Sequence, residues 1–333
     1  MHPTVHARPP AIRKVTCAAA WGAPLLLLLL SVGCATLGSD PGQPLVPTRA
    51  EARTGPFVIY SSTKLGPESA PIRSLRSLEA DVASTLGVRA AATETPVEIY
   101  ILRDRDTFTH FLTFYFPELP PRRAFFIAQG GRRVVYTFQN DRLTEDLRHE
   151  ATHALLHLAV GDLPLWLDEG LAEYFEGTSA PLGVNPEHLE RLPDDLASGW
   201  KPDLAHLESL KNVREMTPRD YRESWAWVHY LLNDSAASRA LLLSWLSEHR
   251  RGDGQEGLAS RLEQVDRSAP HLMLAHLEKL RKAPPSRPSL ASESAVRTSP
   301  STVLLQSAPL EPTPRRSAMS RFLGFLGLGG RGQ

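Results

Sequence analysis

The segment Arg148-His149-Glu150-Ala151-Thr152-His153 is an HExxH motif, and the interpretation of the chain depends on it. Residues four apart lie on one face of a helix, so both imidazoles can reach a single tetrahedral metal ion. Glu150 adjoins His149 and points to one side of the pair, where it can act as a general base. We therefore expect a helix, starting near Thr144 and ending at Gly161, that carries a metal site.

The next segment, residues 164–176, predicts a second helix and contains Trp166-Leu167-Asp168-Glu169-Gly170. Glu169, Glu173 and Glu176 recur at i, i+4 and i+7, so they share one face of this helix. Beside a metal ion, one carboxylate completes the ligand set and another hydrogen-bonds a ligand imidazole, which fixes its tautomer.

These two segments together resemble the gluzincin metallopeptidases of the thermolysin-like, peptidase-MA-like clan, in which HExxH is followed by a W-x-x-E-G helix. The resemblance is specific over residues 149–176 and general elsewhere. It implies a zincin-like fold, Zn²⁺ as cofactor and the following site residues: His149, His153 and Glu169 as ligands, Glu150 as base and Glu173 in support of the ligands. Fifteen residues separate His153 from Glu169, fewer than in the aminopeptidase branch, so Glu173 stays open as the third ligand.

Two other metal-site interpretations fit the sequence less well. A metzincin needs HExxHxxGxxH, but Leu156 and Ala159 occupy the diagnostic positions, which excludes it. His157 follows His153 by four residues, and we interpret it as a packed or solvated histidine.

A third helix is expected from Thr217, the N-cap, with Pro218 at its first position. Its stripe of Tyr221, Trp225, Val228 and Leu232 is typical of a core. Tyr221 also resembles a catalytic tyrosine of the clan's aminopeptidases, which implies that its hydroxyl donates to the oxyanion.

In the resembling fold, the strand before the HExxH helix is a sheet edge that pairs with an extended peptide, which here would be residues 134–138. A plain edge strand capped by Arg132 and Arg133 would look the same in sequence. The acidic G-x-M-E-N motif with which the clan's aminopeptidases bind a free amine does not occur. We therefore expect a peptide or protein substrate and an endopeptidase rather than an aminopeptidase.

The remaining pattern predicts an α+β domain over residues 54–282, with a small mixed or antiparallel sheet followed by a mainly helical lobe. Glycines at 130 and 131 predict a hairpin, and Gly87 predicts a helix end. The expected strands cover residues 57–60, 97–101, 124–127 and 134–138, and an expected helix covers residues 72–86.

The first 33 residues read as a signal peptide, because a basic start precedes an apolar run with six consecutive leucines. Ser31-Val32-Gly33-Cys34 resembles a bacterial lipobox, which implies lipidation of Cys34. We expect a lipid-anchored protein of the cell envelope, with ordinary secretion as the alternative. Residues 34–53 are expected to be a linker and 283–333 a disordered Pro/Ser-rich tail.

The composition narrows the functions further. Lys+Arg and Asp+Glu both number 37, a balance that speaks against a nucleic-acid partner. Both cysteines, Cys17 and Cys34, lie near the start, so the domain can form no internal disulfide. Two alternatives to the zinc peptidase stay open. One is a non-catalytic envelope lipoprotein that uses this fold for binding, and the other is a zinc hydrolase that acts on a non-peptide amide.

Overall fold

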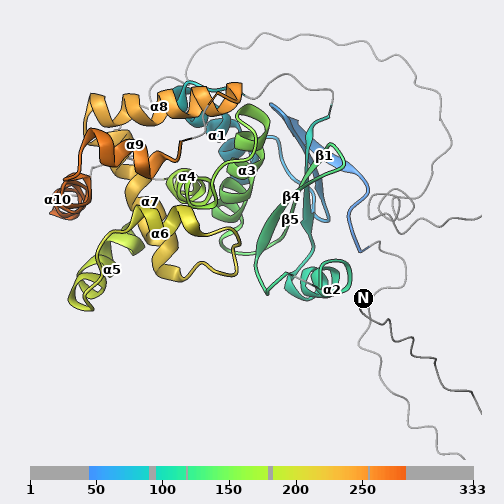
Figure 1. Cartoon of the computed structure of the whole chain (residues 1–333). Helices are drawn as coiled ribbons and strands as arrows, with labels where there is room; N and C mark the ends of the chain where they lie inside the picture. Colours follow the sequence, from blue (N-terminus) through green and yellow to red (C-terminus); the bar gives the residue numbers. More distant parts are fainter. Residues whose placement is uncertain (1–44, 90–94, 118, 179–182, 254–255, 283–333) are drawn as a thin grey trace, which may run out of the picture. The chain divides into compact units, whose positions relative to one another are not determined.

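The computed structural model describes residues 45–89, 95–117, 119–178, 183–253 and 256–282. The predicted signal peptide, Cys34 and the tail 283–333 lie outside these residues. The strands come first and the long helical run follows (Figure 1), so the α+β prediction is confirmed. The described elements are β1 (Ala50–Thr54), β2 (Phe57–Ser61), α1 (Ala70–Leu86), β3 (Val97–Leu102), α2 (Arg105–Tyr115), β4 (Ala124–Gln129), β5 (Arg132–Phe138), α3 (Leu143–Ala159), α4 (Leu165–Glu176), α5 (Pro186–Ala197), α6 (Leu204–Ser209), α7 (Pro218–Asn233), α8 (Ala236–Arg251), α9 (Leu258–Val265) and α10 (Ala269–Lys282).

The sheet has five strands in the order β1-β2-β3-β5-β4. The three inner strands run parallel, and each edge strand is antiparallel to its neighbour. The prediction that residues 134–138 form the sheet edge was therefore wrong. β5 pairs on both sides, with β3 and with β4, which explains why Val134, Val135 and Tyr136 are buried. β4 is the edge strand next to the HExxH helix.

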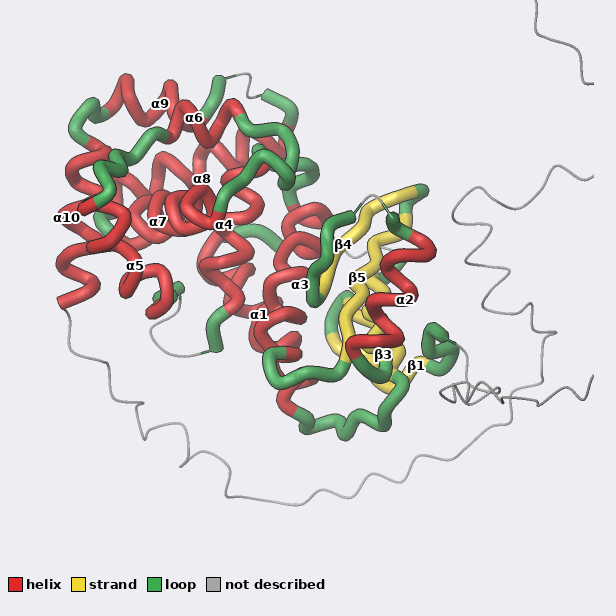
Figure 2. The backbone as a smooth tube through the Cα atoms, turned by 90° about the horizontal axis from the view of Figure 1, so that it is seen from below, coloured by secondary structure: helices red, strands yellow, loops and turns green. Residues whose placement is uncertain are grey.

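Helices cover the two faces of the sheet unequally, as Figure 2 shows. α1 and α3 pack on one face, over Ile59, Ile99 and Val135. The short helix α2 packs on the other face, where its phenylalanines meet Phe125 and Tyr136. This second core is rich in aromatic rings, which bury a large apolar area per residue.

Short sequence signals determine where several elements begin and end. Gly87 caps α1 in the left-handed conformation, at φ 67°. Gly130 and Gly131 have φ of 59° and 77° and form the turn between β4 and β5, as predicted. Thr217 and Asp220 form a capping box at the start of α7. β1, in contrast, begins inside the segment 34–53 that was predicted to be a linker, because it contains Ala and Glu, which are uncommon in strands.

A buried arginine ties the sheet-side helices together. The guanidinium of Arg148 is 1% exposed and donates to the Phe175 carbonyl at 2.7 Å, the Ser74 carbonyl at 3.1 Å and Asp81 at 3.0 Å. These acceptors belong to α4 and α1. The residue before His149 thus fixes the end of α4 against α3, because a buried charge needs all its partners.

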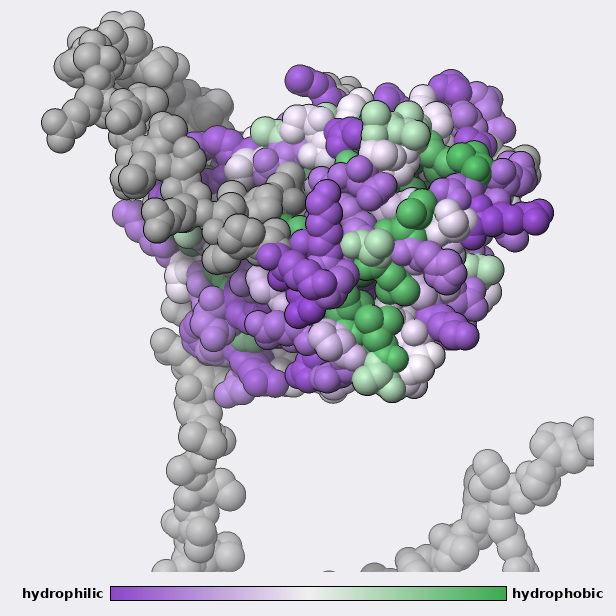
Figure 3. Space-filling view, turned by 90° about the vertical axis from the view of Figure 1, so that its left-hand side faces the viewer, coloured by the Kyte–Doolittle hydropathy of each residue, from purple (hydrophilic) through white to green (hydrophobic). Residues whose placement is uncertain are grey.

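The described surface is mainly polar. On the side of α5 and α10, hydrophilic residues surround a band of apolar side chains (Figure 3). The exposed large apolar residues of the described part are Phe114, Leu196, Val265 and Leu272. None of the described helices combines the length and apolar character that crossing a bilayer requires.

A buried histidine pair predicts acid destabilisation. His229 and His276 lie 2.9 Å apart between Nδ1 and Nε2, and His276 contacts Asp234 at 3.3 Å. Burial, with some repulsion from His276, lowers the pKa of His229 from 6.5 to about 3. The unfolded chain takes up this proton as pH falls through 6.5 and the folded chain does not, so stability is lost below pH 6.5. At pH 5 we expect a loss of about 2 kcal/mol from this group.

Urea unfolding at pH 7.5 and pH 5 would measure this loss. In His229→Gln, the difference between the two free energies of unfolding should shrink by about 2 kcal/mol. His110→Gln is the matched control, because His110 is exposed on α2. An equal pH dependence in wild type and His229→Gln would contradict the prediction.

Candidate metal centre

His149 and His153 on α3 and Glu169 on α4 come together where the two helices pack. Nε2 of His149 lies 3.4 Å and Nε2 of His153 3.7 Å from the same carboxylate oxygen, Oε2 of Glu169. The ligand atoms of the three residues all lie within 4.8 Å of one another. Tetrahedral zinc ligands about 2.0–2.1 Å from the ion are roughly 3.3 Å apart, so this donor set fits a zinc ion.

The other nitrogen of each imidazole is held by a carboxylate. Nδ1 of His153 lies 2.8 Å from Asp168, and Nδ1 of His149 lies 3.2 Å from Glu176. These contacts hold a proton on Nδ1 of each ring, which leaves Nε2, on the side of Glu169, as the nitrogen that can bind a metal. Such outer partners orient metal-binding histidines and raise their basicity.

Glu173 lines the same cleft, and with Glu176 it offers ligand atoms within 4.8 Å of a ring nitrogen of His149. Its carboxylate lies 2.9 Å from Nε2 of His188 and accepts from Asn185 at 3.4 Å. The carboxylate on the His149 imidazole is Glu176. Asn185, the N-cap of α5, also donates to Glu176 at 3.2 Å and so connects the two carboxylates.

The charges of the ligand residues shift one another's pKa values in favour of the charged forms. Burial lowers the pKa of His153, but Asp168 and Glu169 outweigh it and raise the pKa to about 9. Burial raises the pKa of Glu169, yet His153 and His149 lower it overall. Glu169 therefore stays ionised, and a metal ion would displace protons from the imidazoles when it binds.

Glu150 and Tyr221 face the same cleft as the ligands. The cleft has a volume of about 960 Å³ and is also lined by Ala124 and Phe126 of the edge strand β4. Burial raises the pKa of Glu150 above its usual value, although His149 and His153 oppose the shift. Burial, followed by the charge of Glu169, raises the pKa of Tyr221 to about 12, so its hydroxyl stays protonated at neutral pH. The structure thus brings the sequence-predicted residues of the chain's middle into one cleft.

His157 is no part of the ligand set. Its Nδ1 accepts from Arg133 Nε at 3.1 Å, and its ring packs edge-on against Phe126. The sequence interpretation of a packed histidine is confirmed. The other three residues of the predicted stripe, Trp225, Val228 and Leu232, are buried in the core.

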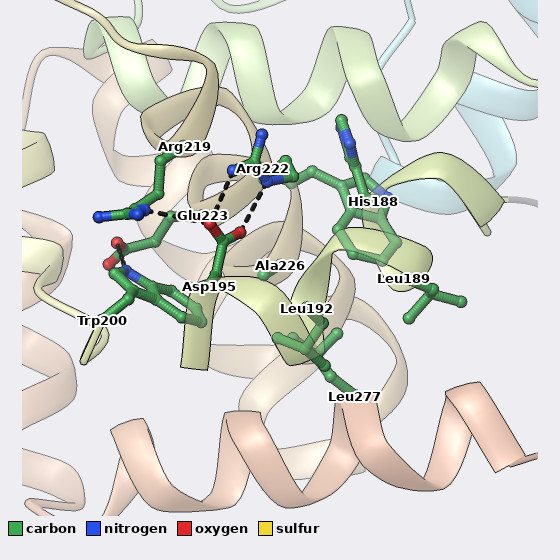
Figure 4. Close-up of a pocket in the computed structure, with 11 residues that line it drawn as sticks. His188, Leu189, Leu192, Asp195, Trp200, Arg219, Arg222, Glu223, Ala226 and Leu277 are labelled. Atoms are coloured by element: carbon green, nitrogen blue, oxygen red, sulfur yellow. Dashed lines mark hydrogen bonds and ion pairs between the residues drawn. The ribbon is translucent and has the colours of Figure 1, made fainter. Parts of the chain in front are cut away.

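A second, small pocket lies between α5 and α7 and is structural (Figure 4). Asp195 accepts from Arg222 at 2.8 Å and from Arg219 at 3.2 Å, and Glu223 accepts from Trp200 at 2.7 Å. These charged side chains thus already have partners within the protein. The pocket holds about 10 Å³, the space of one water molecule, which leaves no room for a substrate.

Gly170 lets the helix of Glu169 approach the helix of Tyr221. A Cβ added at Gly170 would lie 2.5 Å from the Ser224 carbonyl oxygen and 2.9 Å from Val228. Both of those residues belong to α7. The glycine of the W-x-x-E-G motif is therefore a close-packing position that sets the spacing of α4 and α7.

Replacing this glycine should destabilise the protein. We expect Gly170→Ala to lower the free energy of unfolding by about 2–3 kcal/mol, because the methyl group meets backbone that cannot move aside. Gly66→Ala serves as control, since a Cβ at Gly66 meets nothing within 4 Å. Thermal or urea unfolding of both variants measures the effect, and an unchanged Gly170→Ala variant would refute it.

Sequence reasoning missed three residues of this centre: Asp168, Asn185 and His188. Asp168 stands directly before the proposed ligand, and an acidic residue there was a signal that could have been used. Asn185 and His188 lie on or next to α5, and nothing in their local sequence indicates that α5 reaches the cleft.

One family model matches the chain, over residues 144–251, and its description is "Protein of unknown function (DUF1570)". The matched segment runs from the start of α3 to the end of α8 and contains the three ligand-type residues. No curated protein matches the chain.

Proposed function

We propose that this protein is a zinc metallopeptidase of the gluzincin type, with a zincin-like fold. The observation that carries the proposal is the arrangement of His149, His153 and Glu169. Three ligand atoms converge, and a carboxylate contacts Nδ1 of each imidazole, the nitrogen that faces away from the ligand group. Glu150 stands beside this group in a cleft large enough for a peptide.

Bound zinc would supply Lewis-acid chemistry, activating a water and polarising the scissile carbonyl. Glu150 accepts the proton of the attacking water and later donates it to the leaving amine, a role that its raised pKa favours. The Tyr221 hydroxyl, which stays protonated, donates to the carbonyl oxygen as that oxygen gains negative charge.

The substrate we propose is an extended peptide that adds to β4. This strand pairs with β5 on one side, and no described strand pairs with its other side. Two of its residues, Ala124 and Phe126, line the cleft with the ligand residues. Strand addition recognises peptide backbone and does not need a free amine, which agrees with an endopeptidase.

The location we propose is the cell envelope, with a lipid anchor at Cys34. The lipobox-like sequence carries this part of the proposal. Secretion without an anchor remains the alternative. Incorporation of a labelled fatty acid into wild type and into Cys34→Ala would distinguish the two.

Metal content and peptide cleavage together test the proposed function. The purified protein should contain about one zinc per chain and cleave members of a quenched-fluorescence peptide library, and a chelator should remove both properties. His153→Ala should lose the zinc, whereas His110→Ala, on the exposed side of α2, should keep it.

A protein without zinc would overturn the proposal. A protein that binds zinc but cleaves no peptide would leave two alternatives: a binding lipoprotein, or a hydrolase of another amide. Release of ammonia or amine from non-peptide amides separates those two.

A further inference from the structure

Arg122 is a charged residue of the cleft that the proposed chemistry does not use. It stands in the loop before β4 and lines the cleft together with Glu150 and Tyr221. Its Nε is buried, and in the described part of the chain this donor has no hydrogen-bond partner. A buried N–H group without an acceptor is costly, so a native protein that keeps one needs a reason for it.

Two other arginines of the cleft are already paired with carboxylates of the protein. Arg123 donates to Asp146 through Nε at 3.0 Å and through a terminal nitrogen at 2.8 Å. Arg142 pairs with Glu145 at 2.5 Å. Their charges are neutralised within the protein, whereas the Nε of Arg122 is left for a group from outside.

Arg122 shares one cleft with the reacting groups, since Glu150 and Tyr221 line the same cavity. A substrate bound in this cleft therefore lies within reach of both the metal centre and the guanidinium.

A carboxylate matches these properties best. Arginine presents its N–H groups in a planar fork that fits the two oxygens of a carboxylate, and such charged pairs are stronger than neutral ones. We propose that Arg122 binds a carboxylate of the substrate next to the scissile bond. This carboxylate belongs either to an Asp or Glu side chain or to the C-terminus of the peptide. The inference rests on the proposed peptidase function and adds a substrate preference to it.

Binding to an inactive protein tests this preference without cleavage. The zinc-loaded Glu150→Gln protein would be titrated in a calorimeter with four probes: N-acetyl-Ala-Ala-Asp-Ala-amide, its Asn counterpart, N-acetyl-tetraalanine with a free C-terminus, and its C-terminal amide. We expect one carboxylate probe to bind roughly 10- to 100-fold more tightly than its neutral partner. The pair that shows the difference identifies the source of the carboxylate.

Two variants in the Glu150→Gln background show whether Arg122 is responsible. Arg122→Gln should abolish the preference, whereas Arg105→Gln should retain it. Arg105 is the matched control because it lines the same cleft with the same charge but is exposed. Arg122→Lys should keep part of the preference, since it keeps the charge and loses the planar fork.

Three results would overturn the inference: equal binding of both members of each pair, an equal loss in Arg105→Gln, or a preference that survives Arg122→Gln. With Glu150 restored, a fall in kcat of Arg122→Gln that is equal for all probes would indicate an oxyanion role instead. A failure of the peptidase proposal itself would be seen separately, because the wild-type protein would then lack zinc or cleave no peptide.

Discussion

Glu150→Gln should keep its zinc and lose nearly all hydrolytic activity. The amide has the shape of the carboxylate, so the ligand residues stay in place, but it cannot accept a proton from water. Loss of a general base costs typically 10²- to 10⁴-fold, and we expect kcat/KM to fall by roughly 10³-fold. Zinc analysis and cleavage of a fluorogenic peptide, on the same preparation, give both readouts.

The control for this variant lies on the same helix. Glu145 also lines the cleft, at the start of α3, but it pairs with Arg142 and has no proposed part in metal binding or catalysis. Glu145→Gln should keep zinc and activity within about twofold, in line with a surface substitution. An active Glu150→Gln protein would exclude Glu150 as the base and favour the binding-lipoprotein alternative.

Glu169→Gln and Glu173→Gln should differ strongly in zinc affinity. Glu169 has its carboxylate oxygen 3.4 Å and 3.7 Å from the two Nε2 atoms, whereas the hydrogen bonds of Glu173 go to His188 and Asn185. Loss of an outer partner of a ligand costs about 10- to 100-fold in metal affinity, and loss of a ligand should cost more. We expect Glu169→Gln to exceed that range and Glu173→Gln to stay below it.

Competition with a chelator of known zinc affinity measures both variants. Glu176→Gln completes the series as an outer partner, because Glu176 contacts the imidazole of His149. The loss of zinc affinity in Glu176→Gln should lie between the losses in the other two variants. Weaker zinc binding in Glu173→Gln than in Glu169→Gln would assign the third ligand to Glu173.

The local parts of this site were predictable from the sequence because helix geometry fixes them. The spacing of four positions from His149 to His153 places both rings on one face, and the structure has them there. Gly170 could also be noted as a motif residue, but its reason, the close approach of α7, depends on residues about fifty positions away. The pairing of helices across such a distance is not contained in any local pattern.

Non-local packing also explains why the edge prediction was wrong. That prediction came from the resembling fold, but the neighbours β3 and β4 decide whether residues 134–138 form an edge. Glu173 lies on the predicted face of α4, and its contact with His188 of α5 depends on packing that the local sequence does not show. Arg148 gives a comparable case, since a charged residue on a helix reads as exposed until α1 and α4 surround it.

The origin of the two cleft walls has an evolutionary consequence. The groups proposed for chemistry stand on α3, α4 and α7, and α4 packs against both of the others. Ala124, Phe126 and Arg122, in contrast, come from β4 and the loop before it. Under the proposed function, substitutions in the short stretch from α2 to β4 can therefore change which peptides bind and leave the metal centre intact. Substrate specificity and catalysis can then evolve independently of each other.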